Sequence, residues 1–553
     1  MKIKIFALGG LNENGKNMYV VEVKQDIFIF DAGLKYADDM LFGIDYILPN
    51  YDYIKENIKR VKGIFLTHGH NENMGATPDI VKDIPEIKVY GTKFTLSVLK
   101  RELENCEVKF DNMIEIKAHK KINFGENSIF PISMTHSIPD AVGYVLNTKD
   151  GAIVYTGDFV FDPTMIGPYK MDIGKIAYIG KQGVLCLLSE SAYADKIGHT
   201  SPHHRTGKKI REILVKNENR IIFNVYSAHI YNLQELLSEV SKTERKIVIM
   251  GKMLQNIIKN SMELNYIKIN TNSIGDLSNI NDKNVVILVS NEREKAFNNI
   301  NRMLNGYDKY ITIKDTDTIV FAEPISDSIE RTAVKTADKI AKLGAKVIMF
   351  SKKEQLLHHA SSEDLMLMIN LLNPKYYFPV KGEYRYQVAN ANLASEVGIP
   401  KQNILLKQNG DVVTFKDGKL IENFEKIKTE DILIDGNATQ DIGEAVIKDR
   451  EILSENGIVI ISTLLDKSTK KLITKPDVIT RGFVYNKDSK DLINEIKNQS
   501  MELINKNMDN PKYVEYNKLK TILRENIGKY LYKETECKPM IITVFQEIDM
   551  KKN

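Results

Sequence analysis

Cysteine is scarce in this chain, and long hydrophobic runs are missing from it. The three cysteines among 553 residues, Cys106, Cys186 and Cys537, lie far apart and form no C-x-x-C pair. This spacing argues against a disulfide framework and against a zinc ribbon, and it fits a reducing compartment. No apolar run reaches the roughly 18 residues that a membrane-spanning helix needs.

The chain also lacks a large excess of either positive or negative charge. Lys and Arg number 77 and Asp and Glu number 73, which leaves a net charge of +4. Because this excess is small for the length, any RNA surface must be a local groove. Residues 1–8, MKIKIFAL, alternate too regularly for a signal peptide and predict a first strand. We therefore expect a cytoplasmic protein without a membrane partner.

Length and pattern divide the chain into several domains. A chain of 553 residues corresponds to three or four domains at roughly 150 residues each. Residues 206–345 alternate strand-like and helical runs, which is typical of a parallel sheet with crossover helices, and this segment interrupts a first domain. The predicted division is 1–205 and 346–426 for the two parts of the first domain, 206–345 for the inserted domain, 427–449 for a linker and 450–553 for a small C-terminal α+β domain.

The C-terminal domain is predicted to combine a small sheet with two helices. Its expected strands are residues 457–466, 471–474, 482–485 and 540–547. Its expected helices are residues 489–506 and 516–532.

Four short apolar runs in the first 200 residues each lead to a residue that can bind a metal. Continuous Ile, Val and Phe runs suit strands that are buried on both faces, and a strand end is a rigid place for a ligand. The runs are 26–30 before Asp31, 63–67 before His68, 128–135 before His136 and 152–156 before Asp158.

Three imidazoles and one carboxylate form a candidate metal site. His68 and His70, two residues apart in a tight turn, can point at one cation together with His136 and Asp158. This ligand set suits Zn²⁺ or Mn²⁺. The simpler alternative is that these residues are turn histidines and a helix-capping aspartate.

Segments along the whole chain resemble ribonuclease J, the bacterial β-CASP branch of the metallo-β-lactamase superfamily. Residues 67–73, THGHNEN, resemble the superfamily motif H-x-H-x-D-H. Other similar segments are ALGGL at 7–11, DAGLK at 31–35, GIDY at 43–46, HSIPD at 136–140, TGDF at 156–159, SES at 189–191, PVKGEYR at 379–385 and TRGFVY at 480–485. The resemblance implies an α/β fold: a metallo-β-lactamase αββα sandwich at 1–205 and 346–426, with an inserted β-CASP parallel-sheet domain.

The resemblance also implies a second metal ion whose ligand positions are damaged here. Glu72 stands at the aspartate position, Asn73 at the last histidine of the motif, and Lys381 at the histidine of P-V-H-G-E-Y-R. A protonated lysine has no lone pair for a metal. We expect the Lys381 ammonium to replace the second ion and to pair with Glu72 or Asp158. The expected cofactor is therefore one ion per subunit, Zn²⁺ or alternatively Mn²⁺ or Mg²⁺.

The family's RNA-handling positions are partly retained. The family's G-H-A-S turn corresponds to His358, His359, Ala360 and Ser361, which are predicted to bind RNA phosphate. By the resemblance, Asp158, Glu190 and His359 are the expected catalytic residues. The family's S-N-x-H-R-x-Q becomes AHIYNLQ at 228–234, and its G-S-Q-G-E-P becomes NEREKA at 291–296. Loss of the arginine and of the glycines affects the pocket for a 5′-monophosphate, and with it 5′-to-3′ exonuclease activity.

Two functions remain open at this point. The first is a ribonuclease J-type, metal-dependent RNA hydrolase of RNA maturation and decay, including rRNA processing and mRNA decay, with weakened and mainly endonucleolytic activity. The second is a catalytically inactive partner subunit that binds and supports an active ribonuclease J paralogue. The family's dimers and tetramers imply a homodimer or a hetero-oligomer, such as a heterotetramer. A small-molecule metallo-hydrolase such as a lactonase would leave the inserted and C-terminal domains unexplained.

The damaged second site predicts a gain of function by repair. The triple variant Glu72→Asp, Asn73→His, Lys381→His should raise the metal content from about one to about two ions per chain and restore RNA hydrolysis, because two ions clamp the attacking and leaving oxygens. Elemental analysis and an RNA cleavage assay test this expectation. A triple variant that binds two ions yet stays inert would disprove it.

Overall fold

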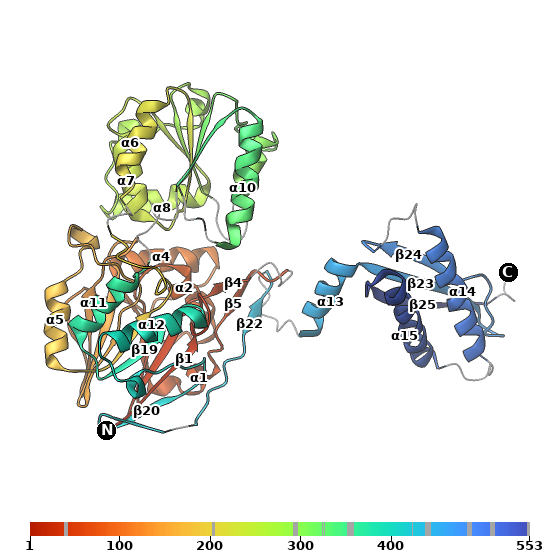
Figure 1. Cartoon of the computed structure of the whole chain (residues 1–553), viewed down its shortest axis with the longest axis horizontal. Helices are drawn as coiled ribbons and strands as arrows, with labels where there is room; N and C mark the ends of the chain where they lie inside the picture. The colour runs from red at the N-terminus through yellow and green to blue at the C-terminus, as the bar shows by residue number, and fades with distance from the viewer. Residues whose placement is uncertain are drawn as a thin grey trace. The chain divides into compact units, whose positions relative to one another are not determined.

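The structure is a computed structural model that describes residues 1–37, 43–201, 205–290, 297–322, 325, 327–350, 359–422, 424–436, 444–483, 489–508 and 515–549 (Figure 1). Contacts divide the chain into two compact units. The larger unit contains Met1–Tyr36 and Tyr46–Ile432, and the smaller contains Ala37–Asp45 and Leu433–Asn553.

Two mixed sheets pack face to face in the larger unit. Phe28 and Phe65 of one sheet share a buried core with Tyr144 and Leu188 of the other, so burial of apolar area holds the two layers together. The eight-stranded sheet has the order β21-β20-β1-β2-β3-β6-β7-β8. Its strands are β1 (Lys2–Gly9), β2 (Met18–Val23), β3 (Asp26–Phe30), β6 (Val61–Phe65), β7 (Val89–Gly91), β8 (Met113–Glu115), β20 (Val413–Lys416) and β21 (Lys419–Ile421).

The six-stranded sheet has the order β19-β13-β12-β11-β10-β9. Its strands are β9 (Ile122–Phe124), β10 (Asn127–Ser133), β11 (Val142–Thr148), β12 (Gly151–Tyr155), β13 (Val184–Glu190) and β19 (Tyr376–Val380). Strand β12 pairs in parallel with β13, and β13 pairs in parallel with β19. The carboxyl ends of these three strands therefore meet at one edge of the sheet.

Helices cover the outer faces of both sheets. Helices α5 (Ile173–Gln182), α11 (Ser362–Leu372) and α12 (Tyr384–Glu396) pack on the six-stranded sheet through a second buried core. Helix α4 (Lys93–Asn105) contacts β7 and β8 and also packs on α3 (Thr77–Asp83). The result is the helix–sheet–sheet–helix order expected from the sequence. The shorter elements are α1 (Asp52–Glu56), α2 (Asn71–Met74), β4 (Lys35–Tyr36), β5 (Tyr46–Leu48) and β22 (Ile432–Ile434).

The inserted segment forms a five-stranded parallel sheet with helices on both faces, as Figure 1 shows. Its order is β15-β16-β14-β17-β18, and all of its strand pairs are parallel. Its strands are β14 (Ile221–Val225), β15 (Ile247–Met250), β16 (Val286–Ser290), β17 (Thr318–Phe321) and β18 (Lys346–Met349). Its helices are α6 (Gly207–Lys216), α7 (Ile230–Val240), α8 (Lys252–Glu263), α9 (Asn298–Leu304) and α10 (Asp327–Lys342).

The smaller unit contains a three-stranded sheet of order β24-β23-β25, and α14 and α15 share its core. Its strands are β23 (Ile458–Asp466), β24 (Asp477–Arg481) and β25 (Met540–Ile548), and its helices are α13 (Glu444–Asn456), α14 (Lys490–Asn507) and α15 (Tyr516–Thr535).

Two of the strands predicted for this unit were misplaced. Residues 471–474 form no strand, because Ser468 and Thr469 donate to Asp466 and close a turn, after which Leu472 makes only an isolated bridge to Leu465. The strand paired with β23 is β24 at Asp477–Arg481, just before the predicted 482–485. Residues 484 and 485 lie outside the described residues.

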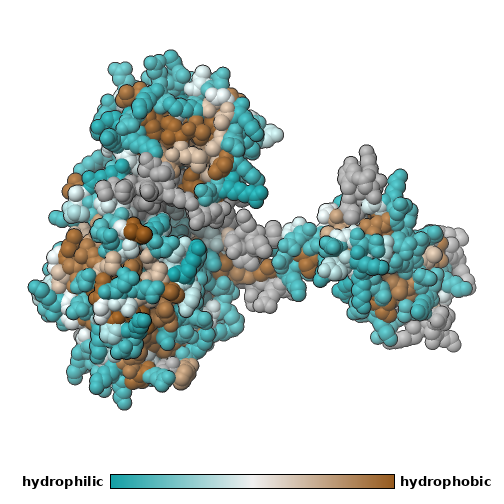
Figure 2. All heavy atoms as spheres, viewed as in Figure 1, coloured by the Kyte–Doolittle hydropathy of each residue, from teal (hydrophilic) through white to brown (hydrophobic). Residues whose placement is uncertain are grey.

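The face of the molecule seen in Figure 2 is mainly hydrophilic. Figure 2 shows hydrophilic residues over most of the visible face, with hydrophobic residues in smaller scattered patches. Among the described residues, no helix combines the length and the apolar character that a bilayer crossing requires.

A buried ion pair in the inserted domain predicts a large loss of stability on mutation. Arg220 Nε and Nη2 donate to the two carboxylate oxygens of Asp317 at 2.9 and 2.5 Å. The variant Asp317→Ala leaves the buried guanidinium without its counter-charge and should lower the free energy of unfolding by about 3–5 kcal/mol. Denaturant unfolding measures this. The matched control Glu263→Ala breaks an exposed pair with Lys259 and should cost less than about 1 kcal/mol. Equal effects of the two variants would contradict the expectation.

Candidate metal centre

The ends of several strands deliver polar side chains to one point. Asp158 follows β12, Glu190 ends β13 and Lys381 follows β19, so the three parallel strands bring them together at their carboxyl ends. His68 follows β6 of the other sheet, and His136 follows β10. The site therefore lies where the edges of the two sheets meet.

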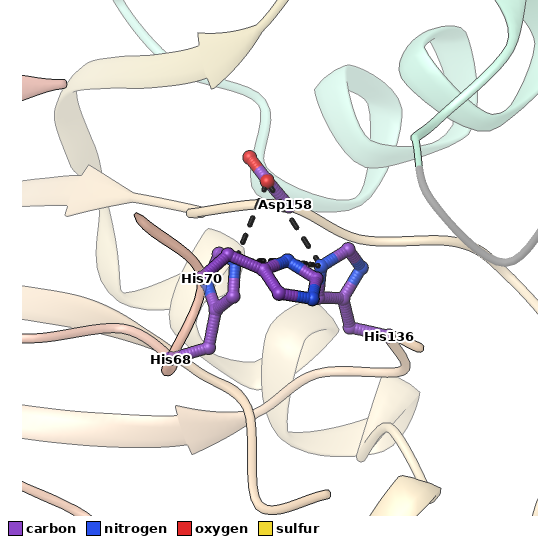
Figure 3. Close-up of side chains that lie close together, drawn as sticks. All are labelled: His68, His70, His136 and Asp158. Carbon is purple, nitrogen blue, oxygen red and sulfur yellow. Dashed lines mark hydrogen bonds and ion pairs between the residues drawn. The ribbon is translucent and has the colours of Figure 1, made fainter. Parts of the chain in front are cut away.

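The four predicted metal ligands come together in a compact cluster (Figure 3). His68 Nε2 and His136 Nε2 each lie 3.1 Å from His70 Nδ1. Asp158 Oδ2 lies 3.5 Å from His68 Nε2 and 3.9 Å from His136 Nε2. All four residues are buried.

This donor geometry fits a divalent ion. Ligand atoms about 2.0–2.1 Å from a tetrahedral Zn²⁺ lie roughly 3.3 Å from one another. The observed separations of 3.1 to 3.9 Å bracket that value. Asp158 Oδ1 is buried and accepts no hydrogen bond from the described residues, although a buried carboxylate oxygen normally has a partner.

Neighbouring groups hold His68 in place and keep it neutral. Thr67 Oγ1 lies 2.9 Å from His68 Nδ1, and the Thr67 hydroxyl also donates to Asp31. Burial, and then the charge of nearby His70, lowers the pKa of His68, which leaves a lone pair for a metal. Gly157 permits the close approach of the next strand end, because a Cβ there would lie 2.9 Å from Thr67 Cγ2.

Lys381 pairs directly with Asp158. Its Nζ donates to Asp158 Oδ2, the same oxygen that faces the histidines. Of the two partners expected for Lys381, the described structure therefore pairs it with Asp158. Burial opposes the charge of Lys381, but the negative charges of Asp158 and Glu190 outweigh burial and raise the pKa of the ammonium. Burial likewise opposes ionisation of Asp158, yet Lys381, His359 and His68 hold the pKa of that carboxyl below its usual value.

Asn73 is integrated into a hydrogen-bond network. Its Nδ2 donates to Asp31 Oδ2 at 2.7 Å, and its Oδ1 accepts from Asn17 Nδ2 at 3.2 Å. The backbone oxygen of Glu72 accepts from Asn17 N at 3.0 Å, whereas the Glu72 side chain is partly exposed. The degenerate second-site positions are therefore tied to the scaffold: Asn73 through its side chain, Glu72 through its backbone.

Glu190 orients the predicted catalytic residue His359. Glu190 Oε2 lies 2.6 Å from His359 Nδ1, and Glu190 Oε1 accepts from the backbone N–H of Phe159 at 2.8 Å. Burial raises the pKa of Glu190, against the lowering effect of His359. His359 Nδ1 also lies 3.9 Å from Asp158 Oδ2. Asp158, Glu190 and His359, the three predicted catalytic residues, are thus neighbours.

Only part of the predicted phosphate-binding turn lies within the described residues. His358 lies outside the described residues. The backbone N–H of Ala360 donates to Glu190 Oε1 at 3.3 Å, and that of Ser361 donates to Asp364 Oδ2 at 3.3 Å. Ser361 also begins α11 with a reciprocal cap with Asp364. These two donors therefore already have acceptors within the protein.

One neighbour of the cluster was missed by the sequence prediction. His229, which precedes α7 in the inserted domain, is buried, and its ring centroid lies 6.5 Å from that of His70. The departure of residues 228–234 from the family motif was the signal that could have pointed to it. The other departing segment, residues 291–296, lies outside the described residues.

The sandwich with ligands at its strand ends defines the class of the protein, a metallo-β-lactamase-fold hydrolase. Residues 28–173 match the beta-lactamase superfamily domain, and residues 351–404 match the Zn-dependent metallo-hydrolase RNA specificity domain. Residues 218–341 match the ribonuclease J beta-CASP domain, and residues 445–548 match the ribonuclease J C-terminal domain.

Curated relatives extend this match over nearly the whole chain. Ribonuclease J2 of Bacillus subtilis (strain 168) is 38% identical over 550 residues, which cover 99% of both chains. Ribonuclease J 2 of Streptococcus pyogenes serotype M3 is 34% identical and covers 99% of both chains. Ribonuclease J 2 of Staphylococcus aureus (strain MRSA252) is 33% identical over 99% of this chain and 98% of its own. The chain therefore belongs to the ribonuclease J family, and the predicted family, type-2 resemblance and fold class are confirmed.

A solved structure shares the fold. The crystal structure of a protein of unknown function from Enterococcus faecalis V583 aligns with a TM-score of 0.53 at 16% identity, over 75% of this chain and 100% of that one.

The buried Lys381–Asp158 pair predicts that a metal compensates for loss of the lysine. The variant Lys381→Met leaves the Asp158 charge without its partner and should lower the free energy of unfolding by about 3–5 kcal/mol. Added Zn²⁺ should then raise the melting temperature of this variant more than that of the parent, because the cation supplies the missing charge. Thermal unfolding with and without Zn²⁺ measures this. The exposed control Lys181→Met should behave as the parent does, and an equal Zn²⁺ response in Lys381→Met and the parent would contradict the expectation.

Proposed function

We propose that this protein is a metal-dependent RNA phosphodiester hydrolase with one resident ion and a lysine in place of the second. His68, His70, His136 and Asp158 would hold the ion. The observation that carries the proposal is the position of Asp158 Oδ2, which lies within 4 Å of His68 Nε2 and His136 Nε2 and also accepts from Lys381 Nζ. A carboxylate oxygen shared in this way corresponds to the bridging ligand of a two-ion site.

Zn²⁺ is the proposed ion. Three imidazoles and one carboxylate are ligands that zinc prefers, whereas Mg²⁺ favours oxygen ligands, and Mn²⁺ is the second candidate. When bound, such an ion lowers the pKa of a water and polarises a phosphoryl oxygen. The family match to a zinc-dependent metallo-hydrolase supports a metal cofactor.

Lys381 would act as a fixed positive charge beside the reacting phosphodiester. An ammonium can attract a phosphate oxygen and stabilise negative charge that develops there, because it is buried and preorganised. It cannot accept a water as a ligand, so it cannot replace the second ion in activating or clamping oxygens. We therefore propose weakened hydrolysis. Mainly internal cleavage is proposed because residues 228–234 and 291–296 depart from the family motifs of the pocket for a 5′-monophosphate.

Glu190 and His359 would handle the substrate. With Nδ1 held by Glu190, the His359 ring has a set orientation. His359 would then meet an RNA phosphate oxygen with its other ring nitrogen. His358 and Ser361 of the same turn are proposed to contribute further phosphate contacts, with Ala360 setting the turn. The match of residues 351–404 to an RNA specificity domain supports RNA as the partner.

Subunit partners and cellular location complete the proposal. No disulfide joins any of the three cysteines, all of which lie in the described ranges, and this suits the cytoplasm. We propose a homodimer, or a hetero-oligomer with a ribonuclease J paralogue, in which residues 450–553 contribute to assembly. The division into 1–205, 206–345, 346–426, 427–449 and 450–553 is proposed as the domain organisation, with two boundaries moved. Strand β18 (Lys346–Met349) pairs with β17 and belongs to the inserted domain, and α13 (Glu444–Asn456) begins within the predicted linker.

Metal content and RNA cleavage test the function together. Purified protein should contain about one ion per chain and should cut a 5′-monophosphorylated RNA slowly. The variant His68→Ala should lose both the ion and the cleavage. A substrate with a 5′-triphosphate should be cut at a similar rate if cleavage is internal.

Two results would oppose this proposal in different ways. Cleavage that persists in His68→Ala would show that the product comes from a contaminating nuclease or another site. An ion that binds without any cleavage above His68→Ala would favour the alternative function, a partner subunit that supports an active paralogue. That alternative draws on the structure as well, because Lys381 and Asn73 are both engaged by scaffold residues.

A further inference from the structure

One turn of the inserted domain touches two of the proposed metal-ligand loops. The turn is defined as residues 226–231, which comprise the link from β14 to α7 and the first two residues of that helix. His70 Nε2 lies 3.4 Å from the backbone oxygen of Ala228. The backbone N–H of Tyr231 donates to the oxygen of Ser137, which directly follows His136, at 3.0 Å. Two segments far apart in the sequence, near residues 70 and 137, thus bind the same turn.

The turn is internally braced around His229. The backbone N–H of His229 donates to the oxygen of Tyr226 at 3.1 Å and closes the turn. The two rings pack edge to face with centroids 5.0 Å apart. The His229 ring is buried. This buried aromatic ring therefore supports the backbone that carries the Ala228 oxygen toward His70.

Apolar contacts with the sandwich also hold the turn in place. The Tyr231 ring packs edge to face on Tyr169 of the sandwich with centroids 5.3 Å apart. Ile230 of the turn belongs to the same buried core as Ile138 and Ala141, which flank the His136 loop. Because these contacts are apolar and closely packed, the turn can hold its position against the metal-ligand loops.

The Ala228 oxygen has a defined chemical effect on His70. An acceptor at Nε2 favours the tautomer that carries the proton on that nitrogen, which leaves the Nδ1 lone pair for a metal. His70 Nδ1 is the atom that lies 3.1 Å from both His68 Nε2 and His136 Nε2. The turn thus selects both the orientation and the tautomer that a shared ion requires.

We propose that the turn at 226–231 is a positioning element of the metal site, and that His229 is its central positioning residue. The inference rests on the metal site of the proposed function. It assigns to the segment AHIYNLQ a role in preparing His70 and His136. Metal affinity in this protein therefore depends on how the inserted domain is seated against the sandwich.

Binding of Co²⁺ to the full-length protein tests this inference. The variant His229→Asn removes the ring but keeps a residue that favours the position before a helix. It should bind Co²⁺ about 10-fold more weakly, within the range expected when a residue that supports a ligand is lost, and the visible absorption of the bound Co²⁺ should change. The control Val248→Ala removes buried packing from β15 of the same domain away from the turn, and it should leave both readouts as in the parent.

A second pair of variants makes the test independent of how His229→Asn folds. Tyr226→Phe keeps the ring that packs on His229 and should retain the parent's affinity and spectrum, whereas Tyr226→Ala should weaken binding. Parent-like affinity and spectrum in both His229→Asn and Tyr226→Ala would overturn the inference alone. Absence of Co²⁺ binding by the parent itself would overturn the proposed metal site together with the inference.

Discussion

The charge balance around Asp158 is the constraint on which the site depends. The parallel pairing of β12, β13 and β19 places Asp158, Glu190 and Lys381 side by side in a buried region. Two carboxylates there would repel each other, and burial would penalise both. The Lys381 ammonium offsets this cost by pairing directly with Asp158. In the proposed site, a lysine at that strand end would supply the charge of a second cation without offering a coordination position.

Two positions that depart from the family pattern, Asn73 and Lys381, are held by hydrogen bonds to surrounding residues. Asn73 connects Asp31 to Asn17, and Lys381 is held through its backbone, since its N–H donates to the oxygen of Gly10 at 2.8 Å and its oxygen accepts from Ser191. Asp31 and Lys381 both adopt positive φ values, 60° and 53°, which are costly for residues other than glycine. The surrounding hydrogen bonds hold this local backbone.

The inserted domain takes part in the site as well as covering it. Its turn before α7 contacts the loops of two candidate ligands, and it shares a buried core with the segment after His136. A domain inserted into a sandwich can in this way influence the chemistry of the sandwich through a few backbone hydrogen bonds. Residues 228–234, which the family pattern associates with the pocket for the RNA terminus, include Ala228, whose oxygen contacts the candidate ligand His70.

The sequence by itself determined the candidate ligand types and their places at strand ends, because apolar runs and the residues after them are local patterns. The fold class followed from the resemblance of several sequence segments to ribonuclease J. His68, His70, His136 and Asp158 stand out by these local patterns alone. The pattern failed at residues 471–474, where side chains of one turn outweigh strand propensity. Only the tertiary structure decided that Lys381 pairs with Asp158, 223 residues away, and that Ala228 meets His70, 158 residues away. Such contacts depend on how strands pair and domains pack, and sequence spacing carries no record of either.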